Sequence, residues 1–360
     1  MDLGPFLDGT YVTPEPSAGA VREDGVTLLY PGRWHTLIAP TETGKSWWAL
    51  WHAMHEINAG RYVVYAHFEE ASGLGTVGRL LQMGVDKERI REYFVWFSCT
   101  TRWQSGEFAA ELGALICGPL NVAPALVILD GINAACSMHQ WPVDKTEAVG
   151  EYRAQFVSPA TARDIAVLSL GHPPKQRGRE DERHGFGSTA WLDEVDGVGF
   201  RLLPTKDKRI AKGATGMSIL HTVKDRYGEV SRRGLYRDGD GEGWRYMGAF
   251  VVDDSGANTR IRLTQPRDED AVTDTPADVA SRKALEYLRT TVDGSFRSQA
   301  RLEADAKAAG LGWDKTLTKD ALALLRHQGL IEDAPELGTT TAGRLTASGF
   351  ASDLPAEVKP

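Results

Sequence analysis

The sequence has little cysteine, no long apolar run and no excess of positive charge. Its three cysteines, Cys99, Cys117 and Cys136, include no Cys-X-X-Cys pair, so we expect a reducing cytoplasm and no structural zinc site. No stretch is apolar over the roughly 20 residues that a membrane-spanning helix needs. The first ten residues, MDLGPFLDGT, do not have the basic and apolar regions of a secretory signal. A formal net charge of −8 excludes a generally basic protein that coats nucleic acid.

The composition is that of a globular chain long enough for one large domain and one small one. Of the 360 residues, 42% are hydrophobic and 25% are charged, which is ordinary for a folded protein. Strand-like runs alternate with helical ones over most of the chain, and this alternation predicts an α/β fold with a mainly parallel sheet. The acidic, proline-containing stretch QPRDEDAVTDTPAD then predicts a linker. The expected divisions are an N-terminal arm (1–24), an α/β core (25–265), a linker (266–280), a mostly helical module (281–350) and a tail (351–360).

The stretch TLIAPTETGKSWWAL (36–50) contains a candidate phosphate cradle. Residues 39–46 read A-x-x-x-x-G-K-S, one residue away from the phosphate-binding pattern G-x-x-x-x-G-K-[S/T]. In that pattern backbone N–H groups surround the β-phosphate, the lysine reaches the β- and γ-phosphates, and the hydroxyl binds Mg²⁺. A strand expected at 34–38 and a helix expected at 47–57 provide the required order, and the alternative is an ordinary turn between them. The residues expected to surround the nucleotide are Ala39, Pro40, Thr41, Glu42, Thr43, Gly44, Lys45, Ser46 and Trp47.

One residue of this stretch departs from the pattern, and two tryptophans follow it. Ala39 replaces the first glycine, and alanine is tolerated there if its φ is negative. Trp47 and Trp48 follow the hydroxyl residue, and we expect both rings to pack in the core and against neighbours and not to stack on a base.

Acidic residues end two of the predicted strands. The apolar run 125–129 precedes Asp130, and the carboxyl end of a parallel strand is where open α/β sheets bind ligands. We therefore expect Asp130 to hold Mg²⁺, with an ordinary strand-end turn as the alternative. Glu69 and Glu70 follow the strand-like run that begins at Tyr62. One of them can orient the attacking water, and we favour Glu69 over Glu70; the alternative is a pair of solvated acids.

A further predicted strand ends at His172, where the side chain can contact a γ-phosphate and report its loss. The alternative is an ordinary polar residue that is satisfied by its neighbours. The long charged stretch that follows, PPKQRGREDERHGFGST, is expected to be a functional loop at the ligand edge. Its candidate nucleic-acid contacts are Lys175, Arg177, Arg179 and Arg183.

Taken together, these segments resemble the RecA-like ATPases, and in particular the DnaB-like and RepA-like hexameric helicase ATPases of plasmids and phages. The resemblance covers about residues 25–250 and rests on LIAPTETGKSWWAL, YAHFEEASG with RLLQMGV, LVILDGINA, LSLGHPPK with GSTAWLDEVDGV, and HTVKDRYGEV. It implies ATP and Mg²⁺ as ligands and a hexamer in which Lys224 and Arg226 reach a neighbouring subunit's nucleotide. The alternative for this pair is a charged hairpin tip. The chain departs from the family at Ala39, at His172, where replicative helicases carry glutamine, and in showing no separate primase-binding helical domain.

The C-terminal module is expected to contain three helices, at 282–290, 296–309 and 315–328, followed by a strand or turn at 339–344. This order resembles a winged-helix module, in which one helix can enter the DNA major groove. Many such modules bind protein instead, and this one is not basic overall.

The resulting hypothesis is a ring-forming ATPase motor that acts on nucleic acid as a helicase, translocase or loader, with single-stranded DNA favoured. In it Lys45 stabilises phosphate charge, Ser46 and Asp130 hold Mg²⁺, and Glu69 orients water, while Arg226 arrives from the next subunit. A second hypothesis is a non-unwinding ATP-dependent switch that recruits a protein partner through its C-terminal module. A third is a kinase of a small molecule, which the Lys224/Arg226 pair and the appended module disfavour.

Overall fold

The computed structural model divides into two compact units, Met1–Ala271 and Val272–Pro360, each of which is described by itself. Within the described residues, no helix combines the length and the apolar character of a membrane span. The structure describes residues 3–173, 190–205, 208–237, 243–267, 276–291, 294–308 and 315–348.

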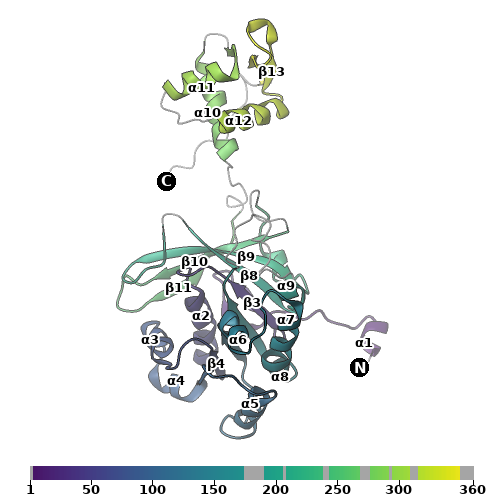
Figure 1. The fold of residues 1–360 in the computed structure, drawn as a ribbon, viewed down its shortest axis with the longest axis vertical. Coiled ribbons are helices and arrows are strands. Elements are labelled where there is room, and N and C mark those ends of the chain that lie inside the picture. The colour runs from purple at the N-terminus through teal and green to yellow at the C-terminus, as the bar shows by residue number, and fades with distance from the viewer. Residues whose placement is uncertain are drawn as a thin grey trace. The chain divides into compact units, whose positions relative to one another are not determined.

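A nine-stranded sheet forms the centre of the first unit, in the order β11-β10-β9-β8-β3-β7-β6-β4-β5 (Figure 1). The strands from β8 to β5 run parallel to one another, and β9, β10 and β11 extend the sheet in antiparallel pairs. The α/β fold class predicted from the sequence, with a mainly parallel sheet, is confirmed. The strands are β3 (Trp34–Ile38), β4 (Val63–His67), β5 (Phe94–Ser98), β6 (Leu126–Asp130), β7 (Ala166–Gly171), β8 (Val198–Pro204), β9 (Thr215–Asp225), β10 (Arg245–Asp253) and β11 (Arg260–Leu263).

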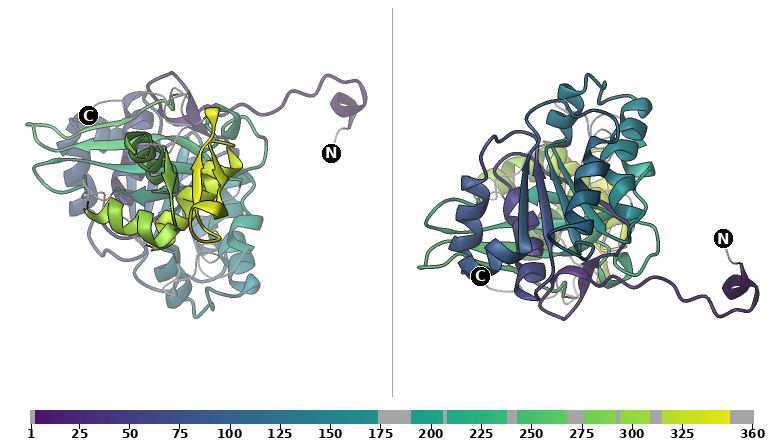
Figure 2. Two further views of the ribbon diagram at one scale, coloured as in Figure 1. Left: turned by 90° about the horizontal axis from the view of Figure 1, so that it is seen from above. Right: turned by 90° about the horizontal axis from the view of Figure 1, so that it is seen from below.

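Helices cover both faces of this sheet, as the right-hand view of Figure 2 shows. Two separate apolar cores result, one on each face, because the inner strands are buried on both sides. On one face lie α2 (Lys45–Asn58), α3 (Leu74–Gln82) and α4 (Lys87–Tyr93). On the other lie α5 (Glu107–Cys117), α6 (Ile132–Met138), α7 (Thr146–Tyr152), a π-helical turn (Arg153–Val157), α8 (Ser158–Thr161) and α9 (Ala190–Asp193).

The register of the parallel strands brings their carboxyl ends to one edge. Ile38 of β3 is paired with Gly171 of β7, and His67 of β4 is paired with Asp130 of β6. The loops that follow β3, β4, β6 and β7 therefore start at about the same level, where ligands bind in such sheets. This edge carries the candidate site.

The N-terminal segment is more ordered than the expected arm (1–24). A short helix, α1 (Gly4–Leu7), opens it, and β1 (Ala18–Val21) pairs with β2 (Thr27–Leu29) in a small antiparallel sheet. Ala20 N donates to His52 Nδ1 of α2 at 2.8 Å. The small residues of β1 allow this close approach, since a Cβ on Gly19 would lie 2.2 Å from the same nitrogen. β1 therefore lies within the predicted arm and is held against α2.

In its described residues, the second unit contains three α-helices, a short 3₁₀-helix (Pro335–Leu337) and a three-stranded antiparallel sheet in the order β12-β14-β13. An apolar core that includes Leu285, Phe296 and Leu325 joins them. The helix predicted at 282–290 begins earlier, at Pro276, and the one predicted from 296 begins at Gln299 because a strand precedes it. The mixed α(+β) composition is confirmed. The elements are α10 (Pro276–Thr290), β12 (Ser295–Phe296), α11 (Gln299–Ala308), α12 (Lys315–His327), β13 (Ile331–Asp333) and β14 (Gly343–Leu345).

Candidate functional site

The loop between β3 and α2 has the backbone of an anion cradle. Gly44, the residue before α2, has φ +88°, and a Cβ there would lie 2.5 Å from Ile210 Cδ1. Only glycine fits this combination of left-handed backbone and close packing. Thr43 Oγ1 donates to Pro40 O at 2.7 Å, and Ser218 Oγ of β9 donates to Thr43 O at 2.9 Å. The loop is thus stabilised by one hydrogen bond within it and by one from β9.

The amide groups at the start of α2 point to the function of this loop. Within the described part of the chain, the N–H groups of Gly44, Lys45 and Ser46 donate to no backbone or side-chain acceptor. Such groups at a helix N-terminus, next to a left-handed glycine, bind anions such as phosphate. The predicted cradle therefore has the geometry that its sequence pattern requires.

Lys45 is half-buried at the first position of α2 and contacts His172. Its Nζ lies 2.8 Å from His172 Nε2, which accepts a hydrogen bond from the ammonium. Burial lowers the pKa of Lys45, while the nearby carboxylates of Asp130 and Glu69 act in the opposite direction. Burial and Lys45 together lower the pKa of His172, so the imidazole is neutral and can accept. The structure brings together residues from the ends of β3, β4, β6 and β7.

Asp130 ends β6 and is 5% exposed. Tyr65 Oη of β4 donates to its Oδ2 at 2.6 Å. Burial and the Asp130 carboxylate raise the pKa of Tyr65 well above its ordinary value, so the phenol keeps its proton and remains a donor. The carboxylate is therefore held in one orientation beside the cradle.

His67 is a site residue that the sequence interpretation missed. Its Nδ1 accepts from Glu69 N at 3.2 Å and from Glu70 N at 3.1 Å. Its other ring nitrogen, Nε2, lies 3.7 Å from Asp130 Oδ2 and 3.8 Å from Glu70 Oε1. His67 shapes the turn that presents the two glutamates. Its place at the end of β4, two residues before Glu69, was the available signal.

Glu69 and Glu70 point to different neighbours. Glu69 is exposed, and its carboxylate acts to raise the pKa of both Lys45 and His172. A Cβ on Gly131 would lie 3.4 Å from Glu69 Oε1, so the carboxylate reaches the residue that follows Asp130. Glu70 faces His67, and its carbonyl oxygen lies 3.5 Å from Ser98 Oγ. Of the two acids, Glu69 is the one beside the cradle.

The residues present fit a magnesium–nucleotide complex and not an all-protein metal site. No group of three or more His, Cys, Asp and Glu side chains in the described part of the chain could hold a metal ion. Ser46 is half-buried in the first turn of α2, and Asp130 lies at the same sheet edge. One hydroxyl and one carboxylate, supplemented by phosphate oxygens and water, are typical of Mg²⁺ in nucleotide sites.

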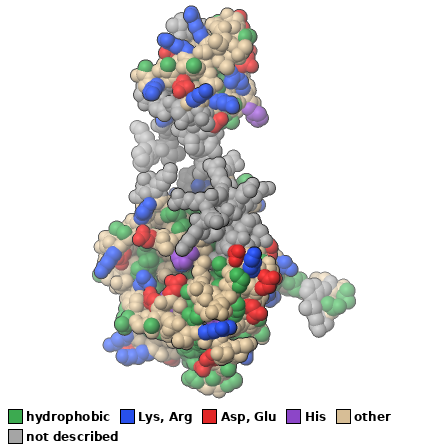
Figure 3. Space-filling model, viewed as in Figure 1, with side chains coloured by type: hydrophobic (Ala, Val, Ile, Leu, Met, Phe, Trp, Pro, Cys, Tyr) green, Lys and Arg blue, Asp and Glu red, His purple; other side chains and the backbone are tan. Residues whose placement is uncertain are grey.

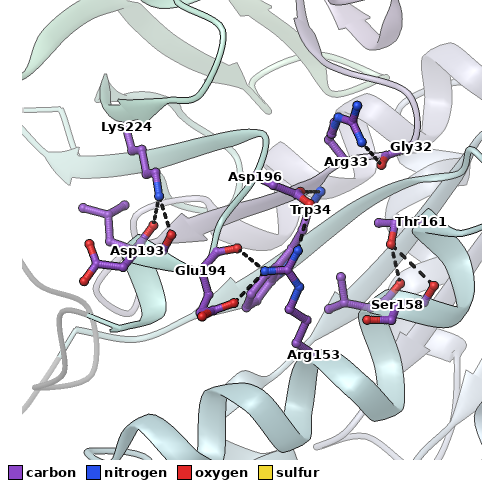
Figure 4. A network of polar contacts seen from close by, with 12 residues as sticks. Gly32, Arg33, Trp34, Arg153, Ser158, Thr161, Asp193, Glu194, Asp196 and Lys224 are labelled. Atoms are coloured by element: carbon purple, nitrogen blue, oxygen red, sulfur yellow. Dashed lines mark hydrogen bonds and ion pairs between the residues drawn. The ribbon is translucent and has the colours of Figure 1, made fainter. Parts of the chain in front are cut away.

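The two residues of the predicted pair, Lys224 and Arg226, have different surroundings. Lys224 Nζ donates to the carbonyl oxygens of Leu192 at 2.8 Å and Asp193 at 2.6 Å, so it ties β9 to α9 of its own chain (Figure 4). Burial lowers its pKa. Arg226 is exposed, and its guanidinium makes no hydrogen bond or ion pair with the described residues. Of the two side chains, that of Arg226 is the one not bound by the described residues.

The segment around Arg226 is firmly held. The carboxylate of Asp225 accepts from Val230 N and Ser231 N, both at 2.8 Å, and from Tyr30 Oη at 3.0 Å. These bonds close the chain back on itself directly after β9. The backbone that carries the exposed guanidinium of Arg226 is thus held in one conformation.

The candidate nucleic-acid loop cannot be compared with the structure in the same way. Lys175, Arg177, Arg179 and Arg183 lie outside the described residues. Among the described side chains on the face shown in Figure 3, basic and acidic groups are interspersed.

Comparison with known proteins finds no family model and no curated protein that matches the sequence, but it does find similar solved structures. Among solved structures, the chain is similar to a KaiC-like protein from the hyperthermophilic archaeon Pyrococcus horikoshii OT3. The two are 11% identical, with 69% of this chain and 99% of that chain covered and a TM-score of 0.46.

Proposed function

We propose that the chain is a RecA-like ATPase that binds ATP with Mg²⁺ at the loop between β3 and α2. The observation that carries this proposal is Lys45, half-buried at the cradle, in contact with His172 and close to the carboxylates of Asp130 and Glu69. A lysine beside free helix amides, with one buried acid and one exposed acid next to it, is the constellation that phosphoryl transfer to water requires.

Each residue then has a separate task. The amides of the cradle and the Lys45 ammonium bind phosphate oxygens, and Ser46 and Asp130 hold Mg²⁺, which offsets part of the phosphate charge. Glu69 orients the attacking water through its exposed carboxylate. Lys45 can exchange its bond to His172 for one to a phosphate oxygen, which makes His172 the residue that senses the γ-phosphate.

Arg226 completes the site of a neighbouring subunit in this proposal, and the assembly is a head-to-tail ring, with a hexamer favoured. Its exposed guanidinium and the firmly held segment behind it support this role. Lys224 is bound to carbonyl oxygens of its own chain, so it positions the end of β9 and does not reach across. The ring would act on nucleic acid, with single-stranded DNA favoured, as a helicase, translocase or loader.

The alternative is a non-unwinding ATP-dependent switch that recruits a protein through the C-terminal unit, which we interpret as a winged helix. Ion pairs in that unit favour it. Arg326 is paired with Asp333 at 2.7 Å, and Arg344 is paired with Glu332 at 2.7 Å and with Glu336 at 3.3 Å. These acids neutralise basic groups that could otherwise bind DNA phosphates.

ATP turnover by Lys45→Ala tests the proposed site. Removing a charge that stabilises the transferring phosphate costs on the order of a hundredfold or more in rate. The exposed Lys208, whose described contacts are made by its backbone oxygen, provides the matched control Lys208→Ala. Phosphate release is measured for both variants. A fall in rate for Lys45→Ala but not for Lys208→Ala shows that the charge matters at the cradle and not merely on the protein surface. Turnover by Lys45→Ala close to that of the unmodified protein would refute the assignment.

A further inference from the structure

A pocket of about 280 Å³ opens beside the cradle. This volume is close to that of the smallest small-molecule sites in proteins. The side chains that matter for its chemistry are those of Trp47, Arg79, Gln82, Ile210, Lys212 and Asp254.

The pocket and the cradle share a wall. Ile210 lines the pocket, and its Cδ1 is the atom that would lie 2.5 Å from a Cβ on Gly44 of the cradle. Trp47 follows Ser46 directly on α2 and also lines the pocket. A molecule whose phosphates bind the cradle amides can therefore extend into this pocket without leaving the protein surface.

The lining suits a flat heteroaromatic ring. Trp47 is half-buried, and the guanidinium of Arg79 lies 5.6 Å from the centroid of its ring. Indole and guanidinium groups both stack on nucleobases. Ile210 adds an apolar surface, and Gln82, Lys212 and Asp254 provide donors and acceptors.

Asp254 is a fixed acceptor at this pocket. Its Oδ2 accepts from Gly213 N at 2.7 Å and its Oδ1 accepts from Thr259 Oγ1 at 2.5 Å. A carboxylate held in this way can accept further hydrogen bonds from a ligand with N–H donors. An amino-bearing base such as adenine has such donors.

We infer that this pocket takes the base of the bound nucleotide, with the base stacked on Trp47. The inference rests on the proposed function, since the phosphates must bind the cradle. The sequence interpretation placed Trp47 among the residues around the nucleotide but expected its ring to pack against neighbours and not to stack on a base. Trp48, by contrast, is fully buried in the core.

The test compares two ligands that share phosphates and differ in the base. Calorimetric titration with ATP and with inorganic tripolyphosphate, both with Mg²⁺, is carried out on the unmodified protein and on Trp47→Ala, Trp47→Phe and Lys45→Ala. A base–aromatic stack is worth about tenfold or more in affinity. We expect Trp47→Ala to weaken ATP by that factor and to leave tripolyphosphate unchanged, and Trp47→Phe to retain most of the ATP affinity. Leu81→Ala, an exposed residue of α3 beside Gln82, is the control.

The outcomes separate this inference from the proposed function. If Trp47→Ala leaves the ratio of the two affinities unchanged, the base does not stack on Trp47, and the inference fails. If Lys45→Ala binds both ligands as well as the unmodified protein, the cradle assignment fails. The unmodified protein provides a test that needs no variant, since equal affinity for ATP and tripolyphosphate would also overturn the base pocket. Unchanged tripolyphosphate binding by Trp47→Ala shows that the variant is folded.

Discussion

Replacing Glu69 by glutamine isolates the group that we propose to orient water. The substitution keeps the size of the side chain and removes its charge. Glu69 is exposed and lies close to the charges of Lys45 and His172. Asp130, the proposed magnesium ligand, remains and keeps its hydrogen bond from Tyr65. We therefore expect ATP to bind Glu69→Gln at least as well as the unmodified protein, because one negative charge near the phosphates is removed.

The expected loss is in the chemical step. A positioned general base contributes about 10²–10⁴-fold to the rate, so kcat should fall by at least about a hundredfold while KM does not rise. Steady-state phosphate release gives kcat and KM, and a filter-binding or calorimetric titration gives the affinity for ATP. A fall in kcat alone separates the loss of the base from the loss of the nucleotide site.

Glu70→Gln is the matched control because it makes the same chemical change one residue away. Glu70 Oε1 lies 3.8 Å from His67 Nε2, and its side chain is 42% exposed. Glu69, and not Glu70, is the acid that acts on Lys45 and His172, so we expect Glu70→Gln to slow hydrolysis less than Glu69→Gln does. If Glu70→Gln stops hydrolysis and Glu69→Gln does not, the two assignments must be exchanged. If neither variant slows hydrolysis, the end of β4 does not carry the base.

Two further predictions concern assembly and acid stability. Arg226→Ala should bind ATP normally and hydrolyse it poorly, and mixing it with Glu69→Gln should restore part of the activity, because some interfaces then contain both groups. Arg233→Ala, an exposed arginine in the same connection, should not behave in this way; a fully active monomer by mass photometry would contradict the shared site. Burial lowers the pKa of His35 from 6.5 to about 4, so between these values the unfolded state binds more protons, and stability falls as the pH falls. The full pKa shift of His35 corresponds to a loss of about 3 kcal/mol in the free energy of unfolding. Urea unfolding measures this free energy at about pH 7 and at about pH 4, and equal values would exclude the predicted loss.

The sequence by itself determined the elements that carry the site. The run at 34–38 is β3 in the structure, and Asp130 is the last residue of β6. Buried parallel strands have continuous apolar sequences, and β4, β6 and β7 end at or close to an acid or a histidine, a residue type with recognisable chemistry. The same local signals located α2 and the helices of the C-terminal unit. The hexamer, the nucleic-acid substrate and the winged-helix interpretation stay predictions.

Only the tertiary structure decided which side chains meet. Lys45 contacts His172, which lies 127 positions further along the chain, because β3 and β7 are neighbours in the sheet. The bond from Tyr65 to Asp130 depends on the pairing of β4 with β6, and the capture of Lys224 by α9 carbonyl oxygens depends on the fold of the chain after β7. Apolar periodicity specifies which face of an element is buried but not which element lies beside it. The pocket next to Trp47 could not be predicted for the same reason. Two of its residues come from distant parts of the chain, since Ile210 lies between β8 and β9 and Asp254 directly follows β10.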